Sequence, residues 1–425
     1  MPDHYNIAIL GAGITGVMTA FMLREEGMDV ILIDKSGPGT QTSFGNAGIL
    51  ADSYITPFAP PPLYKWPAAF LGGTPGLRIA WPWGLPFIPW MIKYAHYSTG
   101  AQARSISRHL VPLVKNTFQD YAEIAAKCGA TDYLLQSGRL LLYRSQAKFN
   151  AAVKDIDYAA TQGIELACLN TDELFDLEPC LQTSSRPLLS GGILSRGSGR
   201  VTNPSGLVQS IHDEFIRCGG LFLRRHISSL KNEDGKWHLR CRNRDSVSAD
   251  HLVLCTGPWA NDTIKKLGYH FPIAFKRGYH RHYNLADNIQ PNYAIADDEN
   301  GYVLSQTEYG IRLTTGVEIT RRDAPANATQ ICRAEKSARQ LINFGPKTQA
   351  PDWFGNRPCT PDSLPIIGRA PHHQNLWFNF AHGHIGLTAA PNSARIIRDL
   401  ITRKNAPYIN PVPYSPNRYR HDPHR

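Results

Sequence analysis

The stretch from residue 5 to residue 35 places the strongest constraint on the fold of this chain. An apolar segment at 7–10 runs directly into the sequence GAGITG at 11–16. An Ala-, Leu- and Met-rich segment then ends near Gly27, and a second apolar segment leads to the carboxylate Asp34. This order predicts a strand, a tight turn, a helix and a second strand, which together form the βαβ unit that binds dinucleotides.

Each glycine of this unit has its own physical role. Gly11 permits the turn, Gly13 lets backbone N–H groups approach a pyrophosphate, and Gly16 lets the helix pack closely on the sheet. The helix N-terminus adds N–H donors and a positive dipole end for the phosphates. Asp34 can accept hydrogen bonds from a ribose diol, which favours FAD or NAD over NADP. The alternative is a glycine-rich turn in an ordinary α/β domain.

Length and composition fit a globular protein of two domains. The chain has 425 residues, of which 42% are hydrophobic and 19% charged. The first expected strand begins almost at Met1, so no secretory leader is expected. No apolar run reaches the length of about 18 residues that a transmembrane helix needs, so a cytoplasmic location is expected.

The cysteines and the net charge suggest no metal site and no nucleic-acid partner. The eight cysteines form no CxxC pair, so reduced thiols are expected. The formal net charge of +10 suits an anionic membrane surface, an acidic partner or acidic substrates, or it reflects a generally basic solvated surface. No nucleic-acid recognition motif accompanies the charge. Residues 416–425 are expected to form a flexible basic tail.

A Pro- and Trp-rich segment covers residues 56–97. It contains Trp66, Trp81, Trp83 and Trp90, and its prolines prevent one continuous helix. One interpretation is peripheral contact with the inner face of a membrane, because Trp favours that boundary. The other is a loop that wraps a substrate domain and buries its Trp side chains.

Segments typical of nucleotide-binding domains recur along the chain. A strand at 249–254 leads into CTGPW, and a glycine-rich loop, HGHIGLT, follows a strand at 376–380. The sequence therefore predicts an α/β protein with one discontinuous Rossmann-like domain and an inserted α+β substrate domain built on a mostly antiparallel sheet. We expect the cofactor domain to comprise 1–55, 190–270 and 345–415, and the substrate domain 56–189 and 271–344.

Five motifs together resemble one known family. They are GAGITG with Asp34, SFGNAG at 43–48, CTGPWA at 255–260, RPCTPDSLPIIGR at 357–369 and HGHIGLT at 382–388. In this order they are similar to the FAD-dependent D-amino acid oxidase superfamily, with bacterial D-amino acid dehydrogenases as the nearest branch and glycine and sarcosine oxidases further away. Many flavoproteins share the first motif, whereas the R-P-x-T-P-D motif combined with the C-terminal glycine loop is much more specific.

The resemblance implies FAD extended across the Rossmann-like domain. Positions matching the family's cofactor contacts are Gly11, Gly13, Gly16, Asp34, Lys35, Ser43, Asn46, Gly48, Ile227, Thr256, Gly257, Gly383, Gly386 and Thr388. Some relatives attach the flavin through a histidine of the early loop, where this chain has Asn46, so non-covalent FAD is implied. Cys359 lies directly before the TPD sequence, unlike the flavin-linked cysteine of sarcosine oxidases, and is interpreted as a small packed residue.

The resemblance also implies substrate contacts. Arg357 matches the arginine that binds the substrate carboxylate, and Tyr302 resembles a tyrosine that hydrogen-bonds the same group. His384 stands where glycine oxidases carry a second arginine, and Tyr279 and His280 are weaker lining candidates. The alternatives are a structural ion pair for Arg357, a core tyrosine for Tyr302 and a backbone-bonded loop histidine for His384.

The implied reaction is oxidation of a D-amino acid to an imino acid, which water hydrolyses to a 2-oxo acid. Hydride passes from the α-carbon to flavin N5, so the protein positions the substrate rather than supplying a general base. D-Proline and 4-hydroxy-D-proline fit this branch, with a quinone or dye as electron acceptor. The alternatives are an O₂-using glycine- or sarcosine-type amine oxidase, a flavin subunit of a larger complex and an NAD-binding protein.

Overall fold

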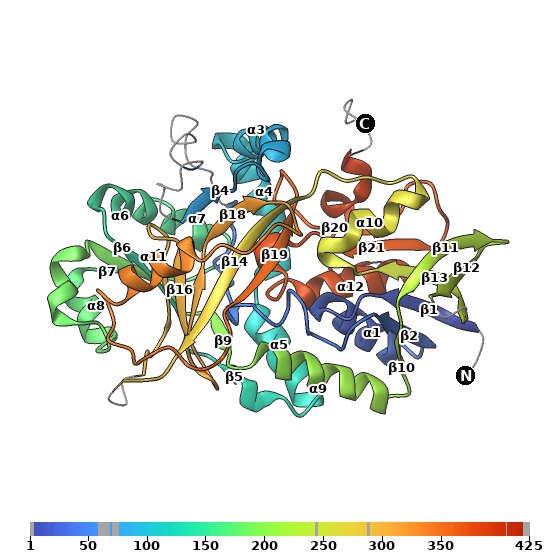
Figure 1. Ribbon diagram of the computed structural model, residues 1–425, viewed down its shortest axis with the longest axis horizontal. Helices are drawn as coiled ribbons and strands as arrows, with labels where there is room; N and C mark the ends of the chain where they lie inside the picture. The colour runs from blue at the N-terminus through green and yellow to red at the C-terminus, as the bar shows by residue number, and fades with distance from the viewer. Residues whose placement is uncertain are drawn as a thin grey trace.

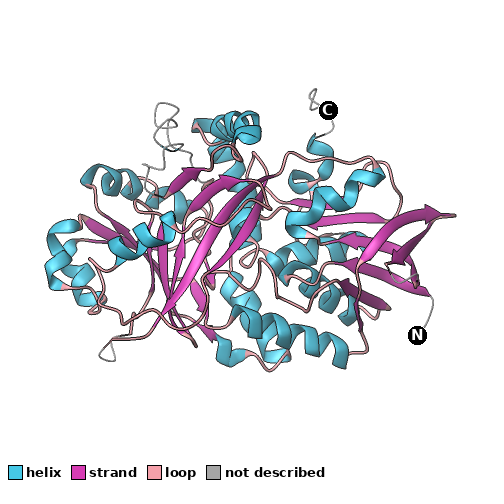
Figure 2. Ribbon diagram, viewed as in Figure 1, coloured by secondary structure: helices cyan, strands magenta, loops and turns pink. Residues whose placement is uncertain are grey.

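Two large β-sheets dominate the molecule (Figure 1). The computed structural model describes residues 4–57, 69, 76–242, 245–286, 290–404 and 406–419. An eight-stranded sheet occupies the right half of the view, and a ten-stranded sheet crosses its centre and left. Figure 2 shows helices beneath and between the sheets, with a second helical group at the left end.

The eight-stranded sheet contains the predicted dinucleotide-binding unit. Its strands are β1 (His4–Leu10), β2 (Val30–Asp34), β10 (Leu221–Arg224), β11 (Ile227–Glu233), β12 (Lys236–Cys241), β13 (Ser246–Leu254), β20 (Ile366–Arg369) and β21 (Leu376–Phe380). Strand β1 lies parallel between β2 and β13, and β10 and β21 extend the parallel region on either side. The Rossmann-like prediction is confirmed.

Helix α1 (Ile14–Glu25) is buried on nearly all sides because it lies between the sheet and two further helices. It packs on α9 (Pro204–Arg217) and α12 (Ala390–Ile401), the latter directly beneath the sheet in Figure 1. This explains why the segment from Val17 to Leu23 is buried all round and, apart from Thr19, apolar rather than amphipathic.

The ten-stranded sheet is mostly antiparallel, as predicted. It contains β4 (Leu77–Ile79), β6 (Arg139–Tyr143), β7 (Leu166–Leu169), β8 (Gly191–Ser195), β14 (Ala274–Tyr283), β15 (Ala294–Asp297), β16 (Tyr302–Thr307), β17 (Gly310–Thr315), β18 (Val317–Thr320) and β19 (Trp353–Cys359). The strand order is β4-β18-β14-β17-β16-β15-β6-β8-β7, with β19 beside β14. One face carries an apolar cluster that includes helix α11 (Thr329–Ala338), and we call it the α11-side core.

The remaining elements connect these two sheets. A small sheet joins β3 (Ile49–Leu50), β5 (Leu134–Leu135) and β9 (Gly199–Val201). The other helices are α3 (Ile88–Tyr97), α4 (Gly100–Val114), α5 (Thr117–Lys127), α6 (Gln146–Val153), α7 (Ile156–Thr161), α8 (Thr171–Leu177) and α10 (Ala260–Ile264). Over the described part of the chain, the structure contains no helix with both the length and the apolar character to cross a bilayer.

Two expectations about chain organisation need correction. Strands β8 and β19 pair within the ten-stranded sheet, although the sequence boundaries assigned both to the cofactor domain. Residues Pro416–Tyr419 form a 3-10 helix rather than a flexible tail, because Arg418 pairs with Asp362 at 2.8 Å. Residues 420–425 of the expected tail lie outside the described chain.

Different Trp residues of the Pro- and Trp-rich segment fit different interpretations. Trp90 is buried in α3, and its Nε1 donates to the Pro272 carbonyl at 3.1 Å. Trp81 is 69% exposed and Trp83 is 37% exposed. Trp66 lies outside the described residues.

Candidate active site

A groove of about 420 Å³ runs along the carboxyl ends of the parallel strands. Asp34, Lys35 and Ile227 line one part of it, whereas Gly383 and Gly386 line another. The glycine turn between β1 and α1 lies along the same groove. The carboxyl edge is where open α/β sheets bind ligands, so this groove is the site expected for the dinucleotide.

The glycine turn is held by close backbone packing. Gly11 has φ +109°, and a Cβ atom there would lie 2.4 Å from the Cys255 carbonyl oxygen. A Cβ at Gly16 would lie 1.8 Å from the Gly11 carbonyl oxygen, so only glycine lets the helix approach the turn. Asp34 accepts hydrogen bonds from the backbone N–H groups of Ala12 and Ser36, both at 2.7 Å. This carboxylate therefore also fixes the turn.

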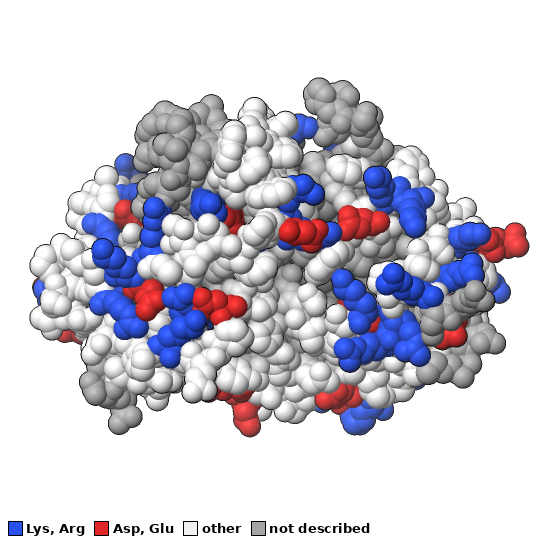
Figure 3. All heavy atoms as spheres, in the orientation of Figure 1, with Lys and Arg blue, Asp and Glu red and all other residues white. Residues whose placement is uncertain are grey.

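Chemistry along the groove fits an anionic dinucleotide. The buried hydroxyl of Thr256 has no hydrogen-bond partner within the described chain, and Thr256 lines the groove. A Cβ at Gly257 would meet nothing within 4 Å, so the backbone there leaves open space. The basic residues Lys35, Arg225 and Lys266 also line the groove. On the face shown in Figure 3, Lys and Arg side chains gather over the half that holds this sheet.

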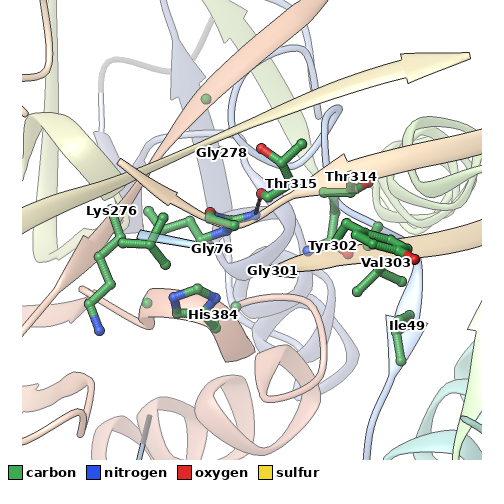
Figure 4. A pocket seen from close by; sticks show the side chains of 18 of the residues that line it. Ile49, Gly76, Lys276, Gly278, Gly301, Tyr302, Val303, Thr314, Thr315 and His384 are labelled. Atoms are coloured by element: carbon green, nitrogen blue, oxygen red, sulfur yellow. Dashed lines mark hydrogen bonds between the residues drawn. The ribbon is translucent and has the colours of Figure 1, made fainter. Parts of the chain in front are cut away.

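A second, larger cavity of about 790 Å³ continues from this groove. The two share Ile14, Thr42, Ser43, Gly383 and Gly386 as lining residues. Strands of the ten-stranded sheet supply much of the far wall, and Figure 4 shows Gly278, Thr314 and Thr315 from β14 and β17 there. A cofactor that extends along the groove would therefore deliver its end to this cavity.

Arg357 lines the larger cavity from β19. Its guanidinium donates to the Gly316 carbonyl at 2.8 Å and the Thr315 carbonyl at 3.4 Å. Among the described residues no carboxylate lies within 4 Å of it, so the structural ion pair considered from the sequence is absent there. A Cβ at Gly278 would lie 2.5 Å from both terminal nitrogens, so glycine at that position leaves room for the guanidinium. Burial lowers the pKa of Arg357.

Lys276 and His384 lie on one side of the same cavity (Figure 4). The Lys276 ammonium lies 3.7 Å from the ring centre of Tyr94, and burial lowers the pKa of Lys276 to about 8. Burial, followed by the charges of Arg357 and Lys276, holds the pKa of His384 well below its usual range. The site therefore combines two cations with a neutral imidazole, which favours an anionic ligand.

Two tyrosines do not meet the expectation from the sequence. Tyr302 borders the cavity, but its side chain belongs to the α11-side core and its hydroxyl accepts from Arg144 at 3.4 Å. Tyr279 also packs in that core, and its hydroxyl donates to Glu318 at 2.5 Å. Alternate residues of a strand face opposite sides, so neither hydroxyl is directed at the Arg357 side of the sheet.

His280 lies on the cavity face of β14 but is covered by other side chains. It stacks on Trp353 with ring centres 5.0 Å apart, and its Nδ1 lies 3.4 Å from the Gly45 carbonyl. Burial, followed by the charges of Arg312 and His282, lowers the pKa of His280 to about 3. The histidine is therefore a neutral packing residue beside the wall of the cavity.

Most of the predicted cofactor residues come together along the two cavities. Asn46 and Thr388 line the larger cavity. Ser43 lines both the groove and the larger cavity, and its hydroxyl accepts a hydrogen bond from the Ile14 N–H at 3.0 Å. Gly16 and Gly48 line neither cavity. A Cβ at Gly48 would lie 2.3 Å from the Val201 carbonyl oxygen, so this glycine permits close packing rather than contact with a ligand.

The sequence predictions missed several residues of the larger cavity. These are Tyr54, Trp90, Tyr94, Arg139 and Lys276. For Arg139 a signal existed, because it is a charged residue in a strand that is otherwise apolar or aromatic, whereas Lys276 lies in a strand with several other basic residues. The aromatic residues lie in or near the Pro- and Trp-rich segment, where no periodicity indicates which side chains face inward.

Residues 6–400 match the family described as FAD dependent oxidoreductase, DAO. The chain belongs to this family. A D-amino-acid oxidase from Bradyrhizobium diazoefficiens is 28% identical over 99% of this chain and 100% of its own length. A D-amino acid dehydrogenase from Rhizobium rhizogenes is 28% identical over 94% of this chain and 96% of its own.

A solved structure shares the fold. Glycine oxidase from Geobacillus kaustophilus superposes with a TM-score of 0.74 at 18% identity, covering 97% of this chain and 98% of its own. The cofactor is therefore FAD, and the residues of the groove fit it. It stays a prediction that the N-terminus of α1 would hold the phosphates and Asp34 the ribose diol, with the flavin toward the larger cavity.

Proposed function

We propose that the protein is an FAD-dependent D-amino acid dehydrogenase that oxidises the C–N bond of its substrate to an imino acid. The observation that carries this proposal is Arg357, a partly buried guanidinium without a carboxylate partner among the described residues, in a cavity continuous with the FAD groove. A planar guanidinium binds a carboxylate through two parallel hydrogen bonds, which fixes both the position and the orientation of an amino acid. Water then hydrolyses the imino acid to a 2-oxo acid.

The chain's own residues position the substrate and select its protonation state. Arg357 holds the carboxylate, and Gly278 leaves the space in which the guanidinium lies. The positive charges of Arg357 and Lys276 disfavour a protonated substrate amine, so they promote the neutral amine from which a hydride can leave. His384 stays neutral and adds no third charge. When bound, FAD supplies the hydride acceptor.

Several finer features belong to the same proposal. Asn46 lines the cavity where some relatives carry a flavin-linked histidine, which supports non-covalent FAD. A quinone or dye is the proposed electron acceptor, and the exposed Trp81 and Trp83 are the proposed contacts with the inner face of a membrane. D-Proline and 4-hydroxy-D-proline remain predictions. An O₂-using amine oxidase and a flavin subunit of a larger complex are the alternatives.

A steady-state assay tests this proposal. The purified holoenzyme is supplied with D- or L-enantiomers of several amino acids, D-proline, 4-hydroxy-D-proline and glycine, with a redox dye either in air or without oxygen. We expect 2-oxo acid from D-enantiomers, dye reduction in equal amount and little peroxide in air. Abundant peroxide would identify the amine oxidase instead, and turnover of L-enantiomers alone would refute the proposal.

A further inference from the structure

We propose that the substrate's side chain carries a second carboxylate and that Arg139 binds it, which makes the substrate an acidic D-amino acid. This inference rests on the proposed function and adds the class of substrate. It starts from a second arginine in the wall of the larger cavity, on a strand distant from Arg357.

Arg139 faces the cavity because of the pleat of β6. Its neighbours Leu140 and Leu142 pack in the α11-side core, so the side chain of Arg139 projects from the opposite face. The residue is 4% exposed, and its buried Nε atom has no hydrogen-bond partner within the described chain. A buried guanidinium without full hydrogen bonding is costly, so an anion at this position would stabilise it.

Carboxylates already present leave Arg139 only weakly paired. Asp298 lies 4.0 Å from its Nη2, and the Asp298 side chain is 50% exposed, so solvent weakens this ion pair. Glu299 accepts from the backbone N–H groups of Arg144 and Ser145 at 2.8 and 2.9 Å. The cavity lining therefore carries four cations, Arg139, Lys148, Lys276 and Arg357, against two carboxylates, Asp298 and Glu299, and Glu299 also pairs with Lys148 at 3.3 Å.

The two arginines approach the cavity from separate parts of the ten-stranded sheet. Strand β19, which carries Arg357, pairs with β14 on the side away from β17, so β19 and β6 lie five positions apart and their backbones are separated by roughly 24 Å. Tyr54 lines the cavity near both arginines. The Arg139 guanidinium is 5.0 Å from its ring centre, and the charges of Arg139 and Arg357 oppose the rise that burial causes in the pKa of Tyr54. A molecule that bears carboxylates at both ends can pass along Tyr54 and contact both arginines.

A basic side chain fits this end of the cavity poorly. Among the described residues Asp298 is the one carboxylate within 4 Å of Arg139, and it already pairs with that arginine. A cationic substrate side chain could pair with Asp298 only in place of Arg139. It would then lie close to the Arg139 guanidinium, and like charges in a desolvated site repel. The acidic side chain is therefore the occupant that the charges favour.

The test compares acids with their isosteric amides. We would measure kcat/KM for D-aspartate and D-asparagine, D-glutamate and D-glutamine, D-arginine and D-proline, using the wild type, Arg139→Met, Asp298→Asn and the control Arg333→Met. Arg333 is exposed on α11, away from the cavity lining. In the wild type the better acid should exceed its amide by about 10- to 100-fold, as expected for one charge-assisted contact.

The variants give opposite expected shifts. Arg139→Met should bring the acid-to-amide ratio close to unity, whereas Asp298→Asn should raise it by removing the competing carboxylate. Arg333→Met should leave the ratio unchanged. If Arg139→Met does not fold, Asp298→Asn decides the question, and a ratio that stays the same or falls refutes the inference.

Failure of this inference and failure of the proposed function give different results. If neutral D-amino acids or D-proline reduce the flavin as well as the acids do, only the acidic-substrate inference is wrong. Preference for D-arginine refutes it in the same way. If no D-amino acid reduces the flavin, the proposed function itself is wrong.

Discussion

Replacement of Arg357 by methionine should abolish most activity without unfolding the protein. In the proposed complex the guanidinium makes two charge-assisted hydrogen bonds to the substrate carboxylate, each contributing about 1.5–3 kcal/mol. Their loss removes about 3–6 kcal/mol of binding in the transition state. Since about 1.4 kcal/mol corresponds to a factor of ten, kcat/KM should fall by about 10²–10⁴.

Stability should respond differently in this variant. Arg357 loses two hydrogen bonds to the carbonyls of Thr315 and Gly316, which contribute about 1–3 kcal/mol, but a desolvated charge is also removed. The free energy of unfolding should therefore change by less than about 2 kcal/mol. Removing one partner of a buried ion pair would instead cost about 3–5 kcal/mol.

The assay combines three measurements on Arg357→Met, with Arg357→Lys as the control that keeps the charge but not the planar fork. These are kcat/KM for a D-amino acid, FAD content from the flavin absorption, and urea unfolding monitored by fluorescence. Arg357→Lys should lie between the wild type and Arg357→Met. Normal kcat/KM in Arg357→Met would refute the carboxylate-binding role. So would a loss of FAD content and stability large enough to account for the whole loss of activity.

Three further predictions concern the groove and the cavity. Gly11→Ala should abolish FAD binding because its Cβ would lie 2.4 Å from the Cys255 carbonyl oxygen. The control Gly27→Ala has φ +80° and nothing within 4 Å, so it should retain FAD and lose about 1 kcal/mol of stability. Flavin absorption measures the FAD content and urea unfolding measures the stability of both variants. Gly278→Ala should push the Arg357 guanidinium by about 1 Å and lower kcat/KM by about 10²-fold at unchanged FAD content. Lys276 is cationic below its pKa of about 8 and neutral above it. Acetate, a simple carboxylate whose binding is monitored through the flavin spectrum, should therefore bind the wild type more weakly as pH rises through about 8. Lys276→Met should not show this change. Equal FAD content in Gly11→Ala and Gly27→Ala, normal kcat/KM in Gly278→Ala, or identical pH profiles for the wild type and Lys276→Met would contradict these expectations.

Much of the cofactor site could be predicted from the sequence because it depends on local backbone rules. The GAGITG turn, the helix that follows and Asp34 are adjacent along the chain, and close packing at Gly11 and Gly16 accepts only glycine. The ends of β13 and β21 could be placed because each strand ends in a buried, largely apolar stretch that leads into a glycine-containing loop.

The substrate cavity was harder to predict because it depends on which face of each strand is inward. Tyr302 and Tyr279 were placed on real strands, but their side chains face the α11-side core. Lys276 precedes Tyr279 by three positions and therefore faces the cavity, yet nothing local distinguishes the two faces of so buried a strand. Arg139 reaches the site through the order of strands in the sheet, which is a long-range property.

Anaerobic titration of the holoenzyme with the two enantiomers of one amino acid tests the central claim most directly. The flavin absorption is followed as first the L- and then the D-enantiomer is added. The proposed function predicts full bleaching by the D-enantiomer, little change with the L-enantiomer, and return of the oxidised spectrum when a redox dye is added. A flavin that no D-amino acid of the panel bleaches would contradict the assignment.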